Sequence, residues 1–351
     1  GHSIFLGQVR GDILQDKKHL FLNADDATVR KLLEEPNTFQ LRQIIGDNTI
    51  LCIDEAQRLP QVGLTLKLIT DEFKHVQLVV SGSSALEISN QTNEPLTGRK
   101  WEYLLYPISW TELEAGIGFT EAEKQLEHRL IYGMYPDVIN HPGKEAEVLQ
   151  QLANSYLYKD ILALANIRKP ELLERLLLAL ALQAGSEVSY NELGQLLQID
   201  KKTIMVYLDL LEKAFIIFRL PSFSRNLRNE IKNNRKIYFW DNGIRNMIIA
   251  NLNILGLRQD KGALWENFLI SERLKYLQYN KEIALPFFWR NSQQQEIDYV
   301  EESNGKITGY EFKWKADGRD KIPQAFKTAY DASATFISRE NFRSFLMQKE
   351  V

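Results

Sequence analysis

The sequence predicts a multidomain protein of the α/β class, and three observations lead to that prediction. Short apolar runs alternate with helical periodicity along residues 1–110, which is typical of a parallel sheet covered by helices. Residues 111–183 have helical periodicity almost throughout, and residues 236–351 combine a long helical pattern with a strand–turn–strand pattern. A chain of 351 residues also has room for two or three domains.

The overall composition is that of a globular protein. Hydrophobic residues make up 44% of the chain and charged residues 25%, and no apolar run reaches the length of a membrane span. The formal net charge is only −3, so any surface for nucleic acid has to be a local basic patch. The single cysteine, Cys52, lies in a predicted buried strand and cannot form an internal disulfide. We therefore expect a cytoplasmic protein with no membrane partner.

The first predicted domain, residues 1–110, is organised around residues 49–57. Four apolar residues run into two adjacent carboxylates, Asp54 and Glu55, a pattern that predicts a strand buried on both faces with acids at its carboxyl end. Open α/β sheets bind ligands at that end of their strands. As a Walker B strand, it would hold Mg²⁺ through Asp54, and Glu55 would polarise the water that attacks a phosphate. A core strand with a solvated acidic end explains the same stretch equally well.

Two further residues of this domain are candidates for a nucleotide site. Ser83 follows the predicted strand 76–80, and its hydroxyl could contact a γ-phosphate or serve as an ordinary N-cap of the next helix. Arg99 follows a turn glycine and could reach a phosphate as an arginine finger, or simply lie on the surface. The remaining elements predicted here are strands at 19–23 and 101–106 and helices at 4–15, 24–35, 39–45 and 64–73.

After the helical stretch, residues 184–235 predict a winged helix-turn-helix. A capping box of Ser189 and Glu192 opens one short helix, a tight turn follows, and a second helix begins at Lys201. Two short helices followed by a strand at 215–220 are typical of that module.

Basic residues in and after the second helix make DNA a candidate partner. The residues expected to face outward from this helix are Lys201, Lys202, Thr203 and Tyr207. The basic stretch that follows includes Arg225, Arg228, Arg235 and Lys236. Clustered lysine and arginine side chains suit DNA phosphates. Winged-helix folds also serve as protein–protein modules, so that alternative stays open.

The last predicted domain, residues 236–351, carries a second acidic cluster. Strands are expected at 236–240, 286–290, 296–300 and 307–314, with a turn at 241–243, a helix from 262 to about 279 and a hairpin turn at 304–305. Because strand side chains repeat every two residues, Glu311 and Lys313 share a face, and Asp298 on the adjacent strand can meet them. Glu266 lies on the preceding helix.

This arrangement is the pattern of the PD-(D/E)XK nuclease fold. Asp298 and Glu311 would ligate Mg²⁺ or Mn²⁺, and Lys313 would stabilise the phosphate or the attacking hydroxide. Glu266 would support a water on the metal. The same fold also occurs as an inactive binding module, so the pattern by itself does not establish cleavage.

Several short motifs together resemble one family, the prokaryotic AAA-type ATPases that carry a DUF4143 region at the C-terminus. The motifs are residues 51–57, 80–84, 96–99, 107–112, 238–241, 265–268 and 288–290. The resemblance implies a P-loop-type parallel α/β domain, a helical lid over 111–183 and a nuclease-like C-terminal domain. It also implies ATP and Mg²⁺ as cofactors and an assembly of several copies, in which Arg99 could act on a neighbour's nucleotide.

The sequence departs from that family at the phosphate loop. The G-x-x-x-x-G-K-[ST] motif does not occur among the 351 residues, and helix 4–15 looks like the helix that normally follows the loop. We therefore expect the P-loop-type domain to be truncated, the chain to begin just past the loop, and ATP to bind weakly and be hydrolysed negligibly.

Two functions are consistent with these patterns. In the first, an AAA-type domain is coupled to a metal-dependent nuclease that acts on DNA. In the second, the chain is a non-catalytic switch in which ATP regulates binding to nucleic acid or protein.

Overall fold

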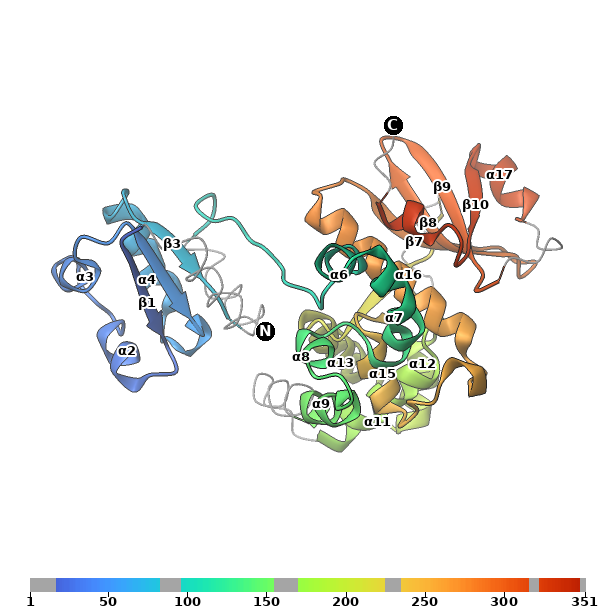
Figure 1. Cartoon of the computed structure of the whole chain (residues 1–351), viewed down its shortest axis with the longest axis horizontal. Helices are drawn as coiled ribbons and strands as arrows, with labels where there is room; N and C mark the ends of the chain where they lie inside the picture. Colours follow the sequence, from blue (N-terminus) through green and yellow to red (C-terminus); the bar gives the residue numbers. More distant parts are fainter. Residues whose placement is uncertain (1–16, 83–95, 155–169, 225–234, 316–321, 348–351) are drawn as a thin grey trace. The chain divides into compact units, whose positions relative to one another are not determined.

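The chain falls into two compact units, residues 1–105 and 106–351, in a computed structural model (Figure 1). The structure describes residues 17–82, 96–154, 170–224, 235–315 and 322–347. The helix expected at 4–15 and the residues Ser83, Arg225 and Arg228 lie outside these ranges, as do residues 155–169 of the stretch expected to be helical. Along the described ranges, no helix is both long enough and apolar enough to cross a membrane.

The first unit is built on a three-stranded parallel sheet, as the alternation of strands and helices predicted. The strand order is β1 (His19–Asn23), β2 (Ile50–Asp54), β3 (Gln77–Val80). The helices are α2 (Ala27–Leu32), α3 (Thr38–Ile45), the 3-10 helix η2 (Ala56–Arg58) and α4 (Val62–Glu72). Every residue of β2 is buried, because this central strand packs on both faces.

The strand expected at 101–106 is absent. None of the sheets that the structure describes includes these residues. A run rich in aromatic and apolar residues becomes a strand only where a backbone ladder forms beside it, and the composition of the run does not supply that ladder.

The second unit begins with helices, as predicted. They are α6 (Trp110–Ile117), α7 (Phe119–Tyr132), α8 (Pro136–Asn140), α9 (Glu145–Leu152) and α11 (Pro170–Leu182). Ser109 and Glu112 form a capping box at the start of α6, with each side chain satisfying a backbone N–H that has no partner inside the helix.

A helix pair and a small antiparallel sheet follow. The elements are β4 (Glu187–Val188), α12 (Tyr190–Leu197), α13 (Lys201–Lys213), β5 (Ile217–Pro221), β6 (Arg235–Phe239), α15 (Asn242–Ile248) and the 3-10 helix η4 (Leu255–Leu257). Strand β6 lies between β4 and β5. Ser189 caps α12 and Asp200 caps α13.

Two local predictions in this part are wrong. Tyr207 is only 8% exposed, because it lies three residues after Ile204 and so shares the buried face of α13. Residues 241–243 do not form an isolated turn. Asp241 instead caps α15, with its Oδ1 accepting a hydrogen bond from the Ile244 backbone N–H at 3.0 Å.

The C-terminal part pairs a long helix with a four-stranded sheet. The elements are α16 (Lys261–Tyr279), β7 (Leu285–Arg290), β8 (Glu296–Ser303), β9 (Lys306–Phe312), α17 (Gln324–Tyr330), β10 (Ser333–Ile337) and α18 (Phe342–Met347). Strands β7, β8 and β9 are antiparallel, and β10 adds to β9 in parallel. The predicted hairpin turn is confirmed, with φ of 50° at Asn304 and 78° at Gly305.

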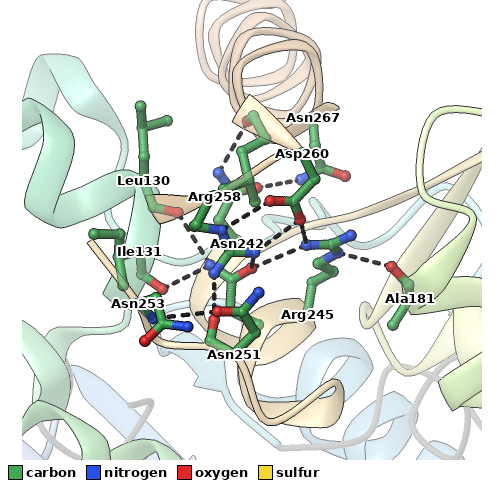
Figure 2. A network of polar contacts seen from close by, with 12 residues as sticks. Leu130, Ile131, Ala181, Asn242, Arg245, Asn251, Asn253, Arg258, Asp260 and Asn267 are labelled. Atoms are coloured by element: carbon green, nitrogen blue, oxygen red, sulfur yellow. Dashed lines mark hydrogen bonds and ion pairs between the residues drawn. The ribbon is translucent and has the colours of Figure 1, made fainter. Parts of the chain in front are cut away.

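A buried polar network fixes the start of α16 against α15 and α7 (Figure 2). Arg258 and Arg245 both pair with the Asp260 carboxylate, and Arg258 Nη2 lies 2.8 Å from Asp260 Oδ2. Asn246 donates hydrogen bonds to the carbonyl oxygens of Leu130 and Ile131 at 3.2 and 2.8 Å. Because nearly every polar group here has a partner, the network holds α16 in a fixed position.

Candidate acidic site

Three charged side chains meet at the end of the β8–β9 hairpin that lies away from its turn. Tyr299 pairs with Tyr310, so the next residues along, Asp298 and Glu311, come opposite each other. Asp298 Oδ2 accepts a hydrogen bond from the Phe312 backbone N–H at 2.8 Å. The ammonium group of Lys313, just past the end of β9, donates to Glu311 Oε1 at 3.0 Å. The structure therefore brings together the residues that the strand periodicity had placed on one side of the sheet.

Glu266 faces the same cluster from α16, where two residues of β6 hold it. Its Oε1 accepts hydrogen bonds from Lys236 Nζ at 3.1 Å and from the Tyr238 hydroxyl at 2.5 Å. Asn267, the next residue of α16, bonds both the N–H and the C=O of Phe239. These two hydrogen bonds hold α16 against β6 and so fix the direction in which the Glu266 side chain points.

Lys236, Tyr238 and Glu296 are site residues that the sequence reasoning missed. Lys236 pairs with Glu266 and with Glu296, and its side chain is only 3% exposed. The sequence had placed Lys236 in a solvent-facing basic stretch that could bind phosphates. That prediction is wrong, because the side chain is buried against two carboxylates. The sequence did contain a signal of this pairing, because a lysine in the predicted buried strand 236–240 needs a carboxylate partner.

Burial and neighbouring charges disfavour the ionised form of the two hairpin carboxyl groups. Burial raises the pKa of Asp298 well above its usual range, and the charges of Glu266 and Glu311 raise it further. Burial also raises the pKa of Glu311, against the opposing effect of its hydrogen bond to Lys313. Burial lowers the pKa of Lys236, but Glu266, Asp298 and Glu296 outweigh it, and the pKa lies above the ordinary lysine value.

The donor set suits a divalent cation bound by two carboxylates. Over the described ranges, no three His, Cys, Asp or Glu side chains converge into a ready-made metal site. Mg²⁺ does not need three, because it is commonly bound through one or two carboxylates while keeping several waters. Glu311 Oε2 is buried and has no hydrogen-bond partner. A cation between Asp298 and Glu311 would satisfy that oxygen and relieve the repulsion between the two groups.

The predicted nucleotide-site residues lie in the first unit and are only partly brought together. Asp54, at the end of β2, is 1% exposed, and its Oδ1 accepts a hydrogen bond of 2.5 Å from the Ser81 hydroxyl. Glu55 has a left-handed backbone, and its Oε2 accepts a hydrogen bond from Gln57 at 2.5 Å. Arg99 forms an ion pair of 3.1 Å with Asp71 on α4. Ser83 lies outside the described residues.

The outward face of α13 carries both basic and apolar groups. Lys201 and Lys202 are exposed at its N-terminal end, as predicted, and Met205 and Val206 are exposed beside them. Arg225 and Arg228 lie outside the described residues. This face therefore offers two lysines for phosphate contact within a surface that is not uniformly basic.

Comparison with known families divides the chain into three regions. Residues 1–114 match the family described as an AAA domain. Residues 123–260 match a domain of unknown function, DUF8612, and residues 261–347 match another, DUF4143. Residues 1–114 thus carry the AAA-type region, and residues 261–347 the DUF4143 region, that the motifs had indicated. The acidic cluster draws Lys236 and Tyr238 from the DUF8612 region and its other residues from the DUF4143 region.

Three curated relatives carry the name uncharacterized protein. Those of Mycobacterium tuberculosis and Mycobacterium bovis are each 25% identical to the chain over 275 residues, which is 76% of this chain and 59% of theirs. One of Haemophilus influenzae is 28% identical over 207 residues, which is 56% of this chain and 49% of that protein. The chain thus spans about half to three fifths of these relatives. A solved structure of a Vibrio cholerae protein covers 93% of the chain at 11% identity, with a TM-score of 0.18 that supports no conclusion.

Proposed function

We propose that the acidic site is a metal-dependent nuclease site of the PD-(D/E)XK type that acts on DNA, in a protein whose AAA-type region is of an ATP-binding kind but binds ATP only weakly in this chain. The observation that carries this proposal is the meeting of Asp298, Glu311 and Lys313 on one hairpin, with Glu266 facing them from α16. The order of elements supports it, since a helix precedes three antiparallel strands, and a second helix leads to a strand added in parallel.

Each side chain has a separate chemical task in this proposal. Asp298 and Glu311 hold the cation, whose chemistry when bound is to stabilise negative charge as a Lewis acid. The Lys313 ammonium, which donates to Glu311, would place a positive charge beside the cation and stabilise negative charge on a phosphate oxygen. Lys201 and Lys202 would contact the DNA backbone.

A plasmid-nicking assay tests the proposal. The purified chain should nick supercoiled DNA in the presence of Mn²⁺, EDTA should stop the reaction, and Asp298→Ala and Glu311→Gln should each abolish it. Nicking that survives both substitutions comes from a contaminant. A folded wild-type chain that does not nick in Mn²⁺ or Mg²⁺ would contradict the proposal.

One observation favours a second candidate, a non-catalytic switch that binds nucleic acid or protein under the control of ATP. The Lys236 ammonium already compensates part of the negative charge of the cluster. In that case Asp298→Ala should leave DNA affinity, measured by filter binding, unchanged. The wild-type chain should then bind DNA without nicking it.

A further inference from the structure

We infer that Lys236 is a resident counter-ion of the acidic site, supplied by the DUF8612 region, and that it lowers the affinity of the site for a divalent cation. The inference rests on the proposed metal site and names a residue that controls its occupancy. Lys236 is a positioning residue here, because it acts through the carboxylates.

The position of Lys236 is fixed by the sheet that carries it. It lies in the central strand β6, opposite Glu187 of β4 and Leu220 of β5. Its ammonium also lies 5.5 Å from the centre of the Phe288 ring. With strands on both sides and its side chain buried, Lys236 cannot swing out to solvent without disturbing β6.

The ammonium engages one part of the cluster and leaves another part to a cation. It binds Glu266 and Glu296 directly. The hydrogen bonds of Asp298 and Glu311 come instead from the Phe312 N–H and from Lys313. The carboxylates suited to a metal are thus not bonded to Lys236, yet Asp298 lies in its electrostatic field. A cation that approaches them meets a fixed positive charge in a site where water screens little.

A purely structural ion pair predicts something different. Removing one partner of such a pair destabilises the fold and gives the remaining site no reason to bind metal more tightly. A counter-ion that competes with the metal predicts tighter metal binding once it is gone. Metal affinity, measured apart from stability, therefore separates the two roles.

The test is a titration of the full chain with Mn²⁺ alone, followed by the loss of the free Mn²⁺ signal in electron paramagnetic resonance. The variants are Lys236→Met, Lys236→Arg, and the charge-balanced pair Lys236→Met with Glu296→Gln. We expect Lys236→Met to bind Mn²⁺ at least about tenfold more tightly than the wild type and Lys236→Arg to resemble the wild type. The pair should gain less than Lys236→Met, because it loses a carboxylate together with the ammonium. Adding Asp298→Asn to the pair should remove the gain, which assigns it to this site.

The outcomes are distinguishable. If the wild type binds Mn²⁺ at the Asp298 site, and neither Lys236→Met nor the charge-balanced pair binds it more tightly, the inferred role of Lys236 is refuted and the proposed function stands. If no variant binds Mn²⁺ at this site up to millimolar concentration, the proposed function is wrong and this inference falls with it. If Lys236→Met alone does not fold by circular dichroism, the charge-balanced pair decides, because it removes one carboxylate together with the ammonium that binds it.

Discussion

Lys236 Nζ lies 3.1 Å from Glu266 Oε1, although the two residues are 30 positions apart and belong to regions that match different families. The acidic site of the DUF4143 region is therefore incomplete without strand β6.

Asp298→Asn should stabilise the chain at neutral pH in EDTA by about 1 kcal/mol. The pKa of Asp298 is raised in the folded state, so between the unfolded and folded pKa values the native chain binds a proton that the unfolded chain does not. Stability from this group is lost as pH rises through that window. Thermal melts from pH 5 to 8 should show a smaller fall for the variant. Glu282→Gln, at an exposed carboxylate of the same unit, is the control, and a lower melting temperature for Asp298→Asn at pH 8 would refute the prediction.

Asp260→Asn should destabilise the second unit by about 2 kcal/mol at pH 7. Burial raises the pKa of Asp260, but Arg258 and Arg245 outweigh it and lower the pKa from 3.8 to about 2. The sign is opposite to that of Asp298: this contribution is full above pH 3.8 and is lost as pH falls toward 2.

Urea unfolding at pH 7 and pH 2, followed by tryptophan fluorescence, measures this effect. The difference between wild type and Asp260→Asn should shrink at pH 2. The control is Asp209→Asn, which breaks an ion pair whose aspartate is 51% exposed and should change stability by less than about 0.5 kcal/mol. An equal loss for both variants would mean that the buried network has no special role.

Gly243→Ala should cost about 3 kcal/mol or more, because an added Cβ would lie 2.1 Å from the carbonyl oxygen of Tyr132. Both atoms belong to tightly packed helices, so neither has room to move. Gly262→Ala is a matched control, since it also lies near the start of a helix but has open space around it. That substitution should be neutral or stabilising by about 0.5–1 kcal/mol. Thermal melts compare the two, and equal effects would contradict the packing at Gly243.

Lys201→Ala combined with Lys202→Ala should weaken DNA binding and reduce the slope of log affinity against log salt by about 2, which is about one unit for each phosphate contact. Both lysines are exposed at the N-terminal end of α13. Lys213→Ala, at an exposed lysine at the opposite end of the same helix, is the control and should leave the slope unchanged. An unchanged slope in the double variant would exclude this end of α13 from phosphate contact.

Local pattern predicted much of the fold. The parallel strands of the first unit, the helices after residue 110 and the β8–β9 hairpin all follow from periodicity and turn residues, which act over short distances along the chain. The closeness of Asp298, Glu311 and Lys313 was predictable for the same reason, since a tight turn and a two-residue repeat fix their positions.

Long-range packing could not be predicted in the same way. The partner of Lys236 lies on another element, and no local repeat indicates which carboxylate it meets. Tyr207 reads as an outward polar residue until the packing of Ile204 and Leu208 shows which face of α13 is buried. The run 101–106 has the aromatic and apolar residues of a strand, and local sequence does not show whether a neighbouring ladder exists.

The sharing of the acidic cluster between two regions also constrains evolution. A change of charge at position 236 removes the positive charge that compensates Glu266 and Glu296. Substitutions at these three positions should therefore occur together among relatives. Exchanging only the DUF4143 region between two distant relatives would join a strand and a helix whose charges had diverged separately. Such a chimera should fold well only when β6 is transferred with the helix that it faces.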